Sequence, residues 1–161
     1  MTFDFSEFKK KKIIVTGSST GIGFETGVEF LNLGANVIFH GNQSINDLET
    51  RIKAKSQSQK FKIFKSDFTD LSQVDNFMNN AINYLNGLDI LVNNAGTMVG
   101  RYQLETISEK DFLKIFDLNA KSAYFATKSA CTIFKKQNYG NIINVSTISA
   151  RTGGSAGSSV Y

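Results

Sequence analysis

Short apolar runs alternate along the chain with longer segments in which apolar residues recur at helical spacing. The short runs lack the strict apolar and polar alternation that is typical of a strand with one face in water. They therefore predict strands that are buried on both faces. These strands are expected at residues 13–15, 37–39, 61–64, 90–92 and 142–145.

The longer segments predict helices that cross over between these strands. Residues 21–33 form one such segment, and residues 70–86 form another, with Asp70 as a possible N-cap. Residues 108–137 run without glycine or proline and predict one long helix, whereas residues 53–60 predict a solvated helix end and a loop. Right-handed crossovers then give an α/β fold with a doubly wound parallel sheet, which is a Rossmann fold.

Composition narrows the class of protein. With 161 residues, 41% hydrophobic and 20% charged, the chain predicts one domain over residues 1–161. No apolar stretch is long enough to cross a bilayer and the N-terminus carries acidic residues, so we expect a cytoplasmic protein with no membrane partner. One cysteine and one histidine are too few ligands for a structural zinc site, and no metal is expected.

The net charge of +4 raises the question of nucleic acid binding. The only dense basic run is Lys9 to Lys12, which comes directly before the first apolar strand. Nucleic-acid readers usually combine a basic patch with aromatic or base-reading residues. We interpret this run as a solvated strand entrance and expect no nucleic acid partner.

A glycine-rich segment, Thr-Gly-Ser-Ser-Thr-Gly-Ile-Gly, occupies residues 16–23 between the first predicted strand and the first predicted helix. Glycine lets the backbone approach a pyrophosphate closely, and the helix N-terminus that follows offers unpaired N–H groups. A plain turn would also use glycines, but the strand before and the helix after favour a dinucleotide site. The candidate cofactor-binding residues are Gly17, Ser19, Thr20, Gly21, Ile22 and Gly23.

The spacing of these glycines resembles that of the short-chain dehydrogenase/reductase family. Further segments resemble that family in the same order, over residues 12–161. The Asp in Ser66–Asp70 is similar to the one that holds the adenine, and the Asn-Asn-Ala-Gly at residues 93–96 is similar to the signature beside the cofactor. The resemblance thus implies further cofactor contacts from Asp67, Phe68, Asn93, Ala95 and Gly96. Taken singly, Asp67 could be a cap, and Asn93 and Asn94 could be turn residues.

The resemblance also implies an active site. Asn119 is similar to the family's active-site Asn, which would hold a water in a proton relay, although alone it could mark a helix kink. Tyr161 stands where the family has its general acid, and Thr147, favoured over Ser146, would hydrogen-bond the reacting oxygen. Thr147 and Tyr161 are about one residue further apart than is commonest in the family, which the glycine-rich loop between them can absorb.

The resemblance implies an NAD(P)-dependent oxidoreductase that transfers a hydride between nicotinamide and a carbonyl or alcohol substrate. The family's Tyr-x-x-x-Lys cannot be completed after Tyr161, so we expect the chain to be the N-terminal part of a reductase, inactive alone and homo-oligomeric at full length. The alternative is a non-catalytic fragment that binds a nucleotide or a partner.

The choice of cofactor depends on the end of the second strand, where the sequence reads His40-Gly41-Asn42. An NAD enzyme would place a carboxylate there to bind the ribose 2′-hydroxyl. With Asn42 as the contact, no carboxylate repels a 2′-phosphate, so NADP is favoured over NAD. No arginine is present to clamp that phosphate, and the preference stays open. His40 is interpreted as a strand-end residue near the adenosine.

Overall fold

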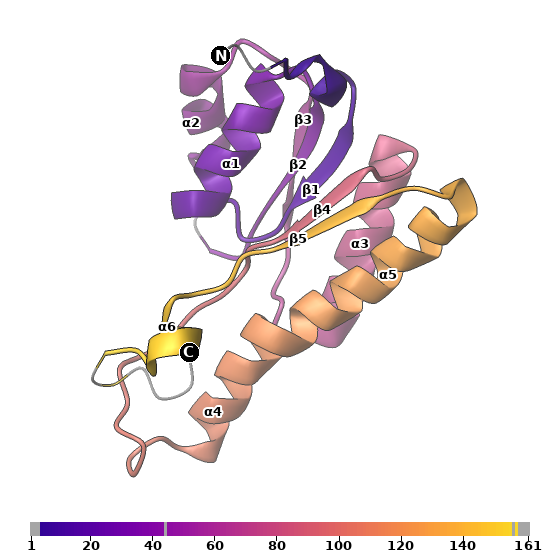
Figure 1. Cartoon of the computed structure of the whole chain (residues 1–161). Coiled ribbons are helices and arrows are strands. Elements are labelled where there is room, and N and C mark those ends of the chain that lie inside the picture. Colours follow the sequence, from indigo (N-terminus) through magenta and orange to yellow (C-terminus); the bar gives the residue numbers. More distant parts are fainter. Residues whose placement is uncertain (1–3, 44, 156, 158–161) are drawn as a thin grey trace.

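The computed structural model describes residues 4–43, 45–155 and 157, and a parallel five-stranded sheet forms its centre (Figure 1). The strands are β1 (Lys12–Val15), β2 (Asn36–Gly41), β3 (Phe61–Lys65), β4 (Ile90–Asn93) and β5 (Asn141–Asn144). Their order is β3-β2-β1-β4-β5, and every neighbouring pair is parallel. The predicted strands and the doubly wound α/β fold are therefore confirmed.

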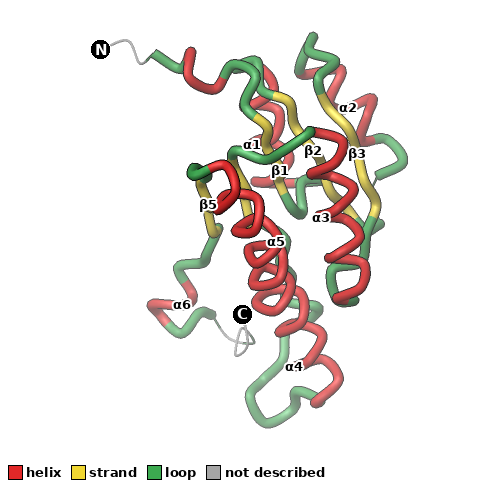
Figure 2. Tube along the Cα trace, turned by 90° about the vertical axis from the view of Figure 1, so that its right-hand side faces the viewer, coloured by secondary structure: helices red, strands yellow, loops and turns green. Residues whose placement is uncertain are grey.

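Helices cover both faces of the sheet. Helices α1 (Gly21–Asn32) and α2 (Leu48–Lys55) lie on one face, and α3 (Leu71–Leu85) and α5 (Ser122–Gln137) lie side by side on the other (Figure 2). Successive residues of a strand point to opposite faces. Ile13 and Val15 accordingly pack with the residues of α1 and α2, while Ile14 packs with those of α3 and α5. Two apolar layers thus hold the strand ends in fixed positions.

Helix α3 begins at a side-chain cap, whereas α2 has none. Asp70 accepts a hydrogen bond from the Ser72 N–H at 2.9 Å, so the predicted cap of α3 is confirmed. Helix α2 ends at Lys55, as the predicted helix end requires, but it begins earlier, and its fully buried Leu48 and Ile52 attach it to the core. Eight residues with two core contacts give too weak a periodic signal to locate that beginning in the sequence.

The predicted long helix is continuous but not uniform. It consists of α4 (Glu109–Phe116), a π-helical turn at Asp117–Lys121, and α5. Ser108 caps its start by accepting a hydrogen bond from the Asp111 N–H at 3.1 Å. Such wide turns are rare within helices and are frequent at functional sites.

All five strands are parallel, so their carboxyl ends open at one end of the sheet. Helix α4 and the short α6 (Ser149–Thr152) extend beyond that end (Figure 1). Ligands of open α/β sheets bind in the crevice outside the carboxyl ends of the strands.

No helix among the described residues is long and apolar enough to span a bilayer.

Candidate functional site

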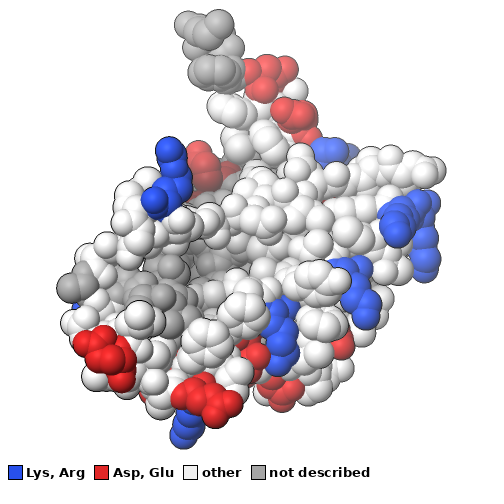
Figure 3. Space-filling model, turned by 60° about the horizontal axis from the view of Figure 1, so that its bottom comes forward, with Lys and Arg blue, Asp and Glu red and all other residues white. Residues whose placement is uncertain are grey.

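A cleft of about 650 Å³ opens at the carboxyl end of the sheet. The loops that follow β1, β2, β3 and β4 line it, and Figure 3 shows that this end of the molecule is hollowed. The predicted cofactor-binding residues along its wall are Gly17, Ser19, Thr20, Ile22, Asn42, Asp67, Phe68, Ala95 and Gly96. The strand ends therefore bring most of the predicted residues to one place.

The glycine loop leaves the N-terminus of α1 open. Its N-cap residue, Thr20, makes no side-chain cap hydrogen bond, and the first turn contains no acidic residue. Gly21 has a φ of +58°, and a Cβ placed there would meet no atom within 4 Å. The N–H groups and the positive end of the helix dipole therefore face open space, which is the arrangement that binds a phosphate group.

Gly17 in this loop and Gly23 in the first turn of α1 allow close packing. A Cβ on Gly17 would lie 2.6 Å from Ala95 Cα, and one on Gly23 would lie 2.3 Å from Asn94 Nδ2. Gly17 also has a φ of +60°, which side chains rarely adopt. These glycines let the loop after β1 press against the loop after β4.

Thr16 and Asn94 hold those two loops together. Both lie within predicted segments, residues 16–23 and 93–96, but neither is among the residues predicted to contact a cofactor or substrate. The Thr16 hydroxyl accepts hydrogen bonds from the N–H groups of Asn94 at 2.9 Å and Ala95 at 3.0 Å. In return, Asn94 Nδ2 donates to the carbonyls of Thr16 at 3.0 Å and Gly17 at 2.9 Å. Their positions at the ends of adjacent strands are the signal that could have identified them.

Asn93 is directed elsewhere. Its buried Nδ2 donates to Thr127 Oγ1 on α5 at 3.0 Å and to Asn144 Oδ1 on β5 at 2.9 Å. Its Oδ1 is also buried and has no hydrogen-bond partner among the described residues. The side chain thus connects β4 to its neighbours, and its contact with a cofactor stays a prediction.

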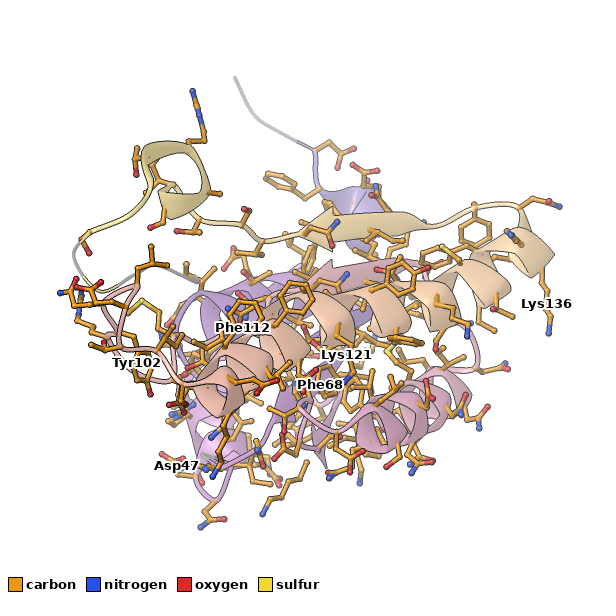
Figure 4. The ribbon with its side chains drawn as sticks, turned by 90° about the horizontal axis from the view of Figure 1, so that it is seen from below. Asp47, Phe68, Tyr102, Phe112, Lys121 and Lys136 are labelled. Carbon is orange, nitrogen blue, oxygen red and sulfur yellow. The ribbon has the colours of Figure 1, made fainter. Side chains whose placement is uncertain are left out.

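The opposite wall of the cleft holds a carboxylate. Asp67 accepts hydrogen bonds from the Thr69 N–H at 2.9 Å and the Thr69 hydroxyl at 2.8 Å. The bond from the Thr69 N–H is the main cause that holds the pKa of Asp67 below its usual range, and Asn42 adds to it. The neighbouring Phe68 is buried and directs its ring inward (Figure 4). Asp67 is therefore an ionised hydrogen-bond acceptor at neutral pH.

A second cleft of about 510 Å³ adjoins the first, because Ile22 and residues 94–96 line both. Asn119, Ser146 and Thr147 lie along its wall, so three of the four predicted catalytic residues share one space. The fourth, Tyr161, lies outside the described residues.

Asn119 lies within the π-helical turn. Its Oδ1 accepts from the Thr97 N–H at 2.8 Å, and its Nδ2 donates to the Thr97 carbonyl at 2.9 Å. Ser146 is exposed, and the half-buried Thr147 accepts from the Ser149 N–H at 3.2 Å. Both hydroxyls reach the cleft. In the part of the chain that the structure describes, no three His, Cys, Asp or Glu side chains cluster as metal ligands would.

Comparison with known families and curated proteins gives concordant matches. A family model described as short chain dehydrogenase matches residues 11–161. A probable NADP-dependent mannitol dehydrogenase of Yarrowia lipolytica is 30% identical over 142 residues, which are 88% of this chain and 51% of that protein. A hydroxynaphthalene reductase-like protein Arp2 of Metarhizium acridum is 29% identical over 153 residues, which are 94% of this chain and 56% of that protein. The chain thus spans about half the length of these relatives.

Solved structures match nearly the full length of this chain. The complex of the NADH-dependent reductase A1-R′ with NAD has a TM-score of 0.88 and 30% identity, and the match covers 98% of this chain and 68% of that one. A short chain dehydrogenase from Burkholderia cenocepacia in complex with NADP has a TM-score of 0.84 and 25% identity, with coverage of 96% and 62%. The chain is therefore similar in fold to proteins whose solved structures contain NAD or NADP.

Proposed function

The chain belongs to the short chain dehydrogenase family, and from this we propose that residues 1–161 form the dinucleotide-binding part of an NAD(P)-dependent oxidoreductase. The single observation that carries the proposal is the junction of the two clefts. The open N-terminus of α1 and Asp67 border one cleft, and Asn119 and Thr147 border the other. One elongated ligand can therefore reach from Asp67 to Asn119 and Thr147.

The residues of the first cleft fit such a ligand. The N–H groups of Gly21, Ile22 and Gly23 would bind its pyrophosphate, because no cap or acid competes for them. The Asp67 carboxylate would accept a hydrogen bond from the amino group of the adenine. When bound, the nicotinamide supplies or accepts the hydride.

The second cleft is where we expect proton transfer to or from the substrate oxygen. Tyr161 would donate a proton to the substrate oxygen in reduction and accept it in oxidation, while the Thr147 hydroxyl, or that of Ser146, hydrogen-bonds the same oxygen. Both polar groups of the Asn119 amide are bonded to Thr97, so Asn119 would hold the relay water through its remaining lone pairs or its backbone. The substrate class proposed is a carbonyl compound or the corresponding alcohol.

NADP is the cofactor that we favour. Asn42 borders the cleft directly after β2, where a carboxylate would repel a 2′-phosphate. The relatives differ on this point, since the Yarrowia protein is named as NADP-dependent and A1-R′ as NADH-dependent. A lower Kd for NADPH than for NADH would support the preference, and the reverse order would refute it.

We also propose that the oxidoreductase is a homo-oligomer. Phe112 and Phe116 stack at 6.1 Å on α4, and these two rings and Tyr124 are exposed on the continuous helix α4–α5. Such an apolar surface fits a second copy of the protein. The cytoplasmic location expected from the sequence stays a prediction.

An activity assay separates the enzyme from the alternative of a non-catalytic binding fragment. Absorbance of the reduced nicotinamide would be followed with a panel of ketones and alcohols, using residues 1–161 and, in parallel, the protein as its gene encodes it. We expect no measurable turnover from residues 1–161, because the lysine that lowers the tyrosine pKa in the family is not among them. Turnover by the gene-encoded protein supports the oxidoreductase, and its absence supports the binding fragment.

A further inference from the structure

We propose that His40 is a positioning residue that fixes the phosphate-binding loop after β1 against the adenine-binding loop after β3. The inference rests on the proposed function, because it assigns those two loops to the two parts of a dinucleotide. His40 is the only histidine of the chain and is 3% exposed. It lies near the end of β2, the strand next to both β1 and β3.

Three hydrogen bonds attach His40 to the glycine loop. Its Nδ1 accepts from the Gly17 N–H at 2.9 Å. Its own N–H donates to the Ser18 hydroxyl at 2.8 Å, and its carbonyl accepts from the Ser18 N–H at 2.8 Å. Both the side chain and the backbone of His40 therefore hold the start of this loop.

The other edge of the ring faces the loop after β3. His40 Nε2 lies 3.1 Å from the Ser66 carbonyl, and the ring stacks on Phe68 with centroids 3.9 Å apart. Ser66 and Phe68 are the two neighbours of Asp67 in the sequence, so the ring contacts the chain on both sides of that carboxylate. One imidazole thereby spans the space between the two loops.

These partners specify one protonation state. The Gly17 N–H is a donor, so Nδ1 must present a lone pair, and the Ser66 carbonyl is an acceptor, so Nε2 must carry the proton. A second proton, on Nδ1, would point at the Gly17 N–H. Burial of the ring lowers the pKa of His40 to about 4, against smaller opposing effects of the Ser66 carbonyl and the Asp67 charge. The aromatic rings that contact the imidazole, those of Phe68 and Phe77, are uncharged.

Both ring nitrogens are already hydrogen-bonded to the protein, so His40 would affect a ligand only through the positions of the two loops. A ligand that binds both loops, such as ADP, depends on their separation, whereas adenosine needs the loop after β3 and not the phosphate site. Loss of the ring contacts should therefore weaken ADP binding more than adenosine binding. If His40 served stability alone, its substitution would weaken the binding of both ligands equally or the binding of neither.

Two substitutions test this in the protein as its gene encodes it. His40→Phe keeps a stacking ring but leaves the Gly17 N–H without its acceptor. His40→Asn can place its Oδ1 near the position of Nδ1 and restore that acceptor. Calorimetric titration with ADP and with adenosine should give an ADP Kd raised roughly tenfold in His40→Phe, as expected for one lost buried hydrogen bond. The Kd for adenosine should stay within about twofold, and His40→Asn should recover most of the ADP affinity.

Equal changes for the two ligands in His40→Phe, or no recovery in His40→Asn, would overturn the inference. A second measurement is ¹⁵N NMR of the wild type: the ring signals of His40, assigned by their loss in His40→Phe, report the tautomer, and we expect the neutral Nε2–H form at pH 7. An Nδ1–H or doubly protonated ring would also overturn it. If the wild type binds neither ADP nor adenosine, the proposed function fails, whereas the NMR result still decides whether His40 joins the loops as described.

Discussion

At the glycine-loop end of the clefts, Thr16 and His40 are buried and bonded to neighbouring loops, whereas at the other end Ser146 is exposed and Thr147 bonds within its own turn. The first end rests on β1, which is paired on both sides. The second end follows β5, which lies at the edge of the sheet, where Ile143 is 42% exposed. The residues at the proposed dinucleotide end are therefore more deeply buried and more extensively bonded to other loops than those at the proposed catalytic end.

Removing the Thr16 hydroxyl should produce the largest loss of stability. Thr16→Val keeps the shape of the side chain but leaves the N–H groups of Asn94 and Ala95 without their acceptor. The free energy of unfolding in urea should fall by about 3 kcal/mol, because each unsatisfied buried group costs on the order of 1–3 kcal/mol. Thr16→Ser retains the hydroxyl and is the matched control. Equal losses in the two variants would contradict the role of the hydroxyl.

The second largest effect should be a pH dependence of the free energy of unfolding that is caused by His40. The unfolded chain takes up a proton near pH 6.5, whereas the folded chain resists it until about pH 4. Between these values the unfolded state binds more protons, so the free energy of unfolding falls as pH falls, by up to about 3 kcal/mol. With no other histidine in the chain, His40→Phe should remove most of this slope. A slope between pH 6.5 and 4 that persists in His40→Phe would show that another group causes it.

A smaller effect should separate the central strand from the edge strand. Ile14 on β1 is 0% exposed and Ile143 on β5 is 42% exposed. Ile→Val at residue 14 should cost about 1 kcal/mol, and the same change at residue 143 less than about 0.5 kcal/mol. Chemical denaturation of the two variants checks this difference. Comparable losses would mean that β5 is packed as firmly as β1.

The sequence sufficed to predict the strands and most of the residues that line the first cleft, because those signals are local. A buried parallel strand is a short apolar run, and the glycines of residues 16–23 sit directly between a strand and a helix. In a parallel sheet, ligand-binding loops gather at the carboxyl ends by topology alone. Residues as distant as Gly17 and Asp67 could therefore be assigned to one site.

The hydrogen-bond partners could not be predicted in this way, because they depend on which strands become neighbours. Thr16 meets Asn94 since β1 pairs with β4, and His40 meets Ser66 since β2 pairs with β3. The π-helical turn was also missed, because its side chains continue the helical pattern. The inward direction of Asn93 depends on Thr127 and Asn144, which are distant in sequence.

Titration of NADPH into wild type, Gly21→Val and Gly153→Val decides whether the cleft at the N-terminus of α1 binds a nicotinamide dinucleotide. The two glycines are matched, because their φ angles are +58° and +77° and neither has an atom within 4 Å of a placed Cβ. Both variants therefore bear similar backbone strain, but Gly21→Val alone puts a side chain at the start of α1. We expect binding by wild type and Gly153→Val and none by Gly21→Val. Equal affinity in all three would contradict the assignment of this cleft.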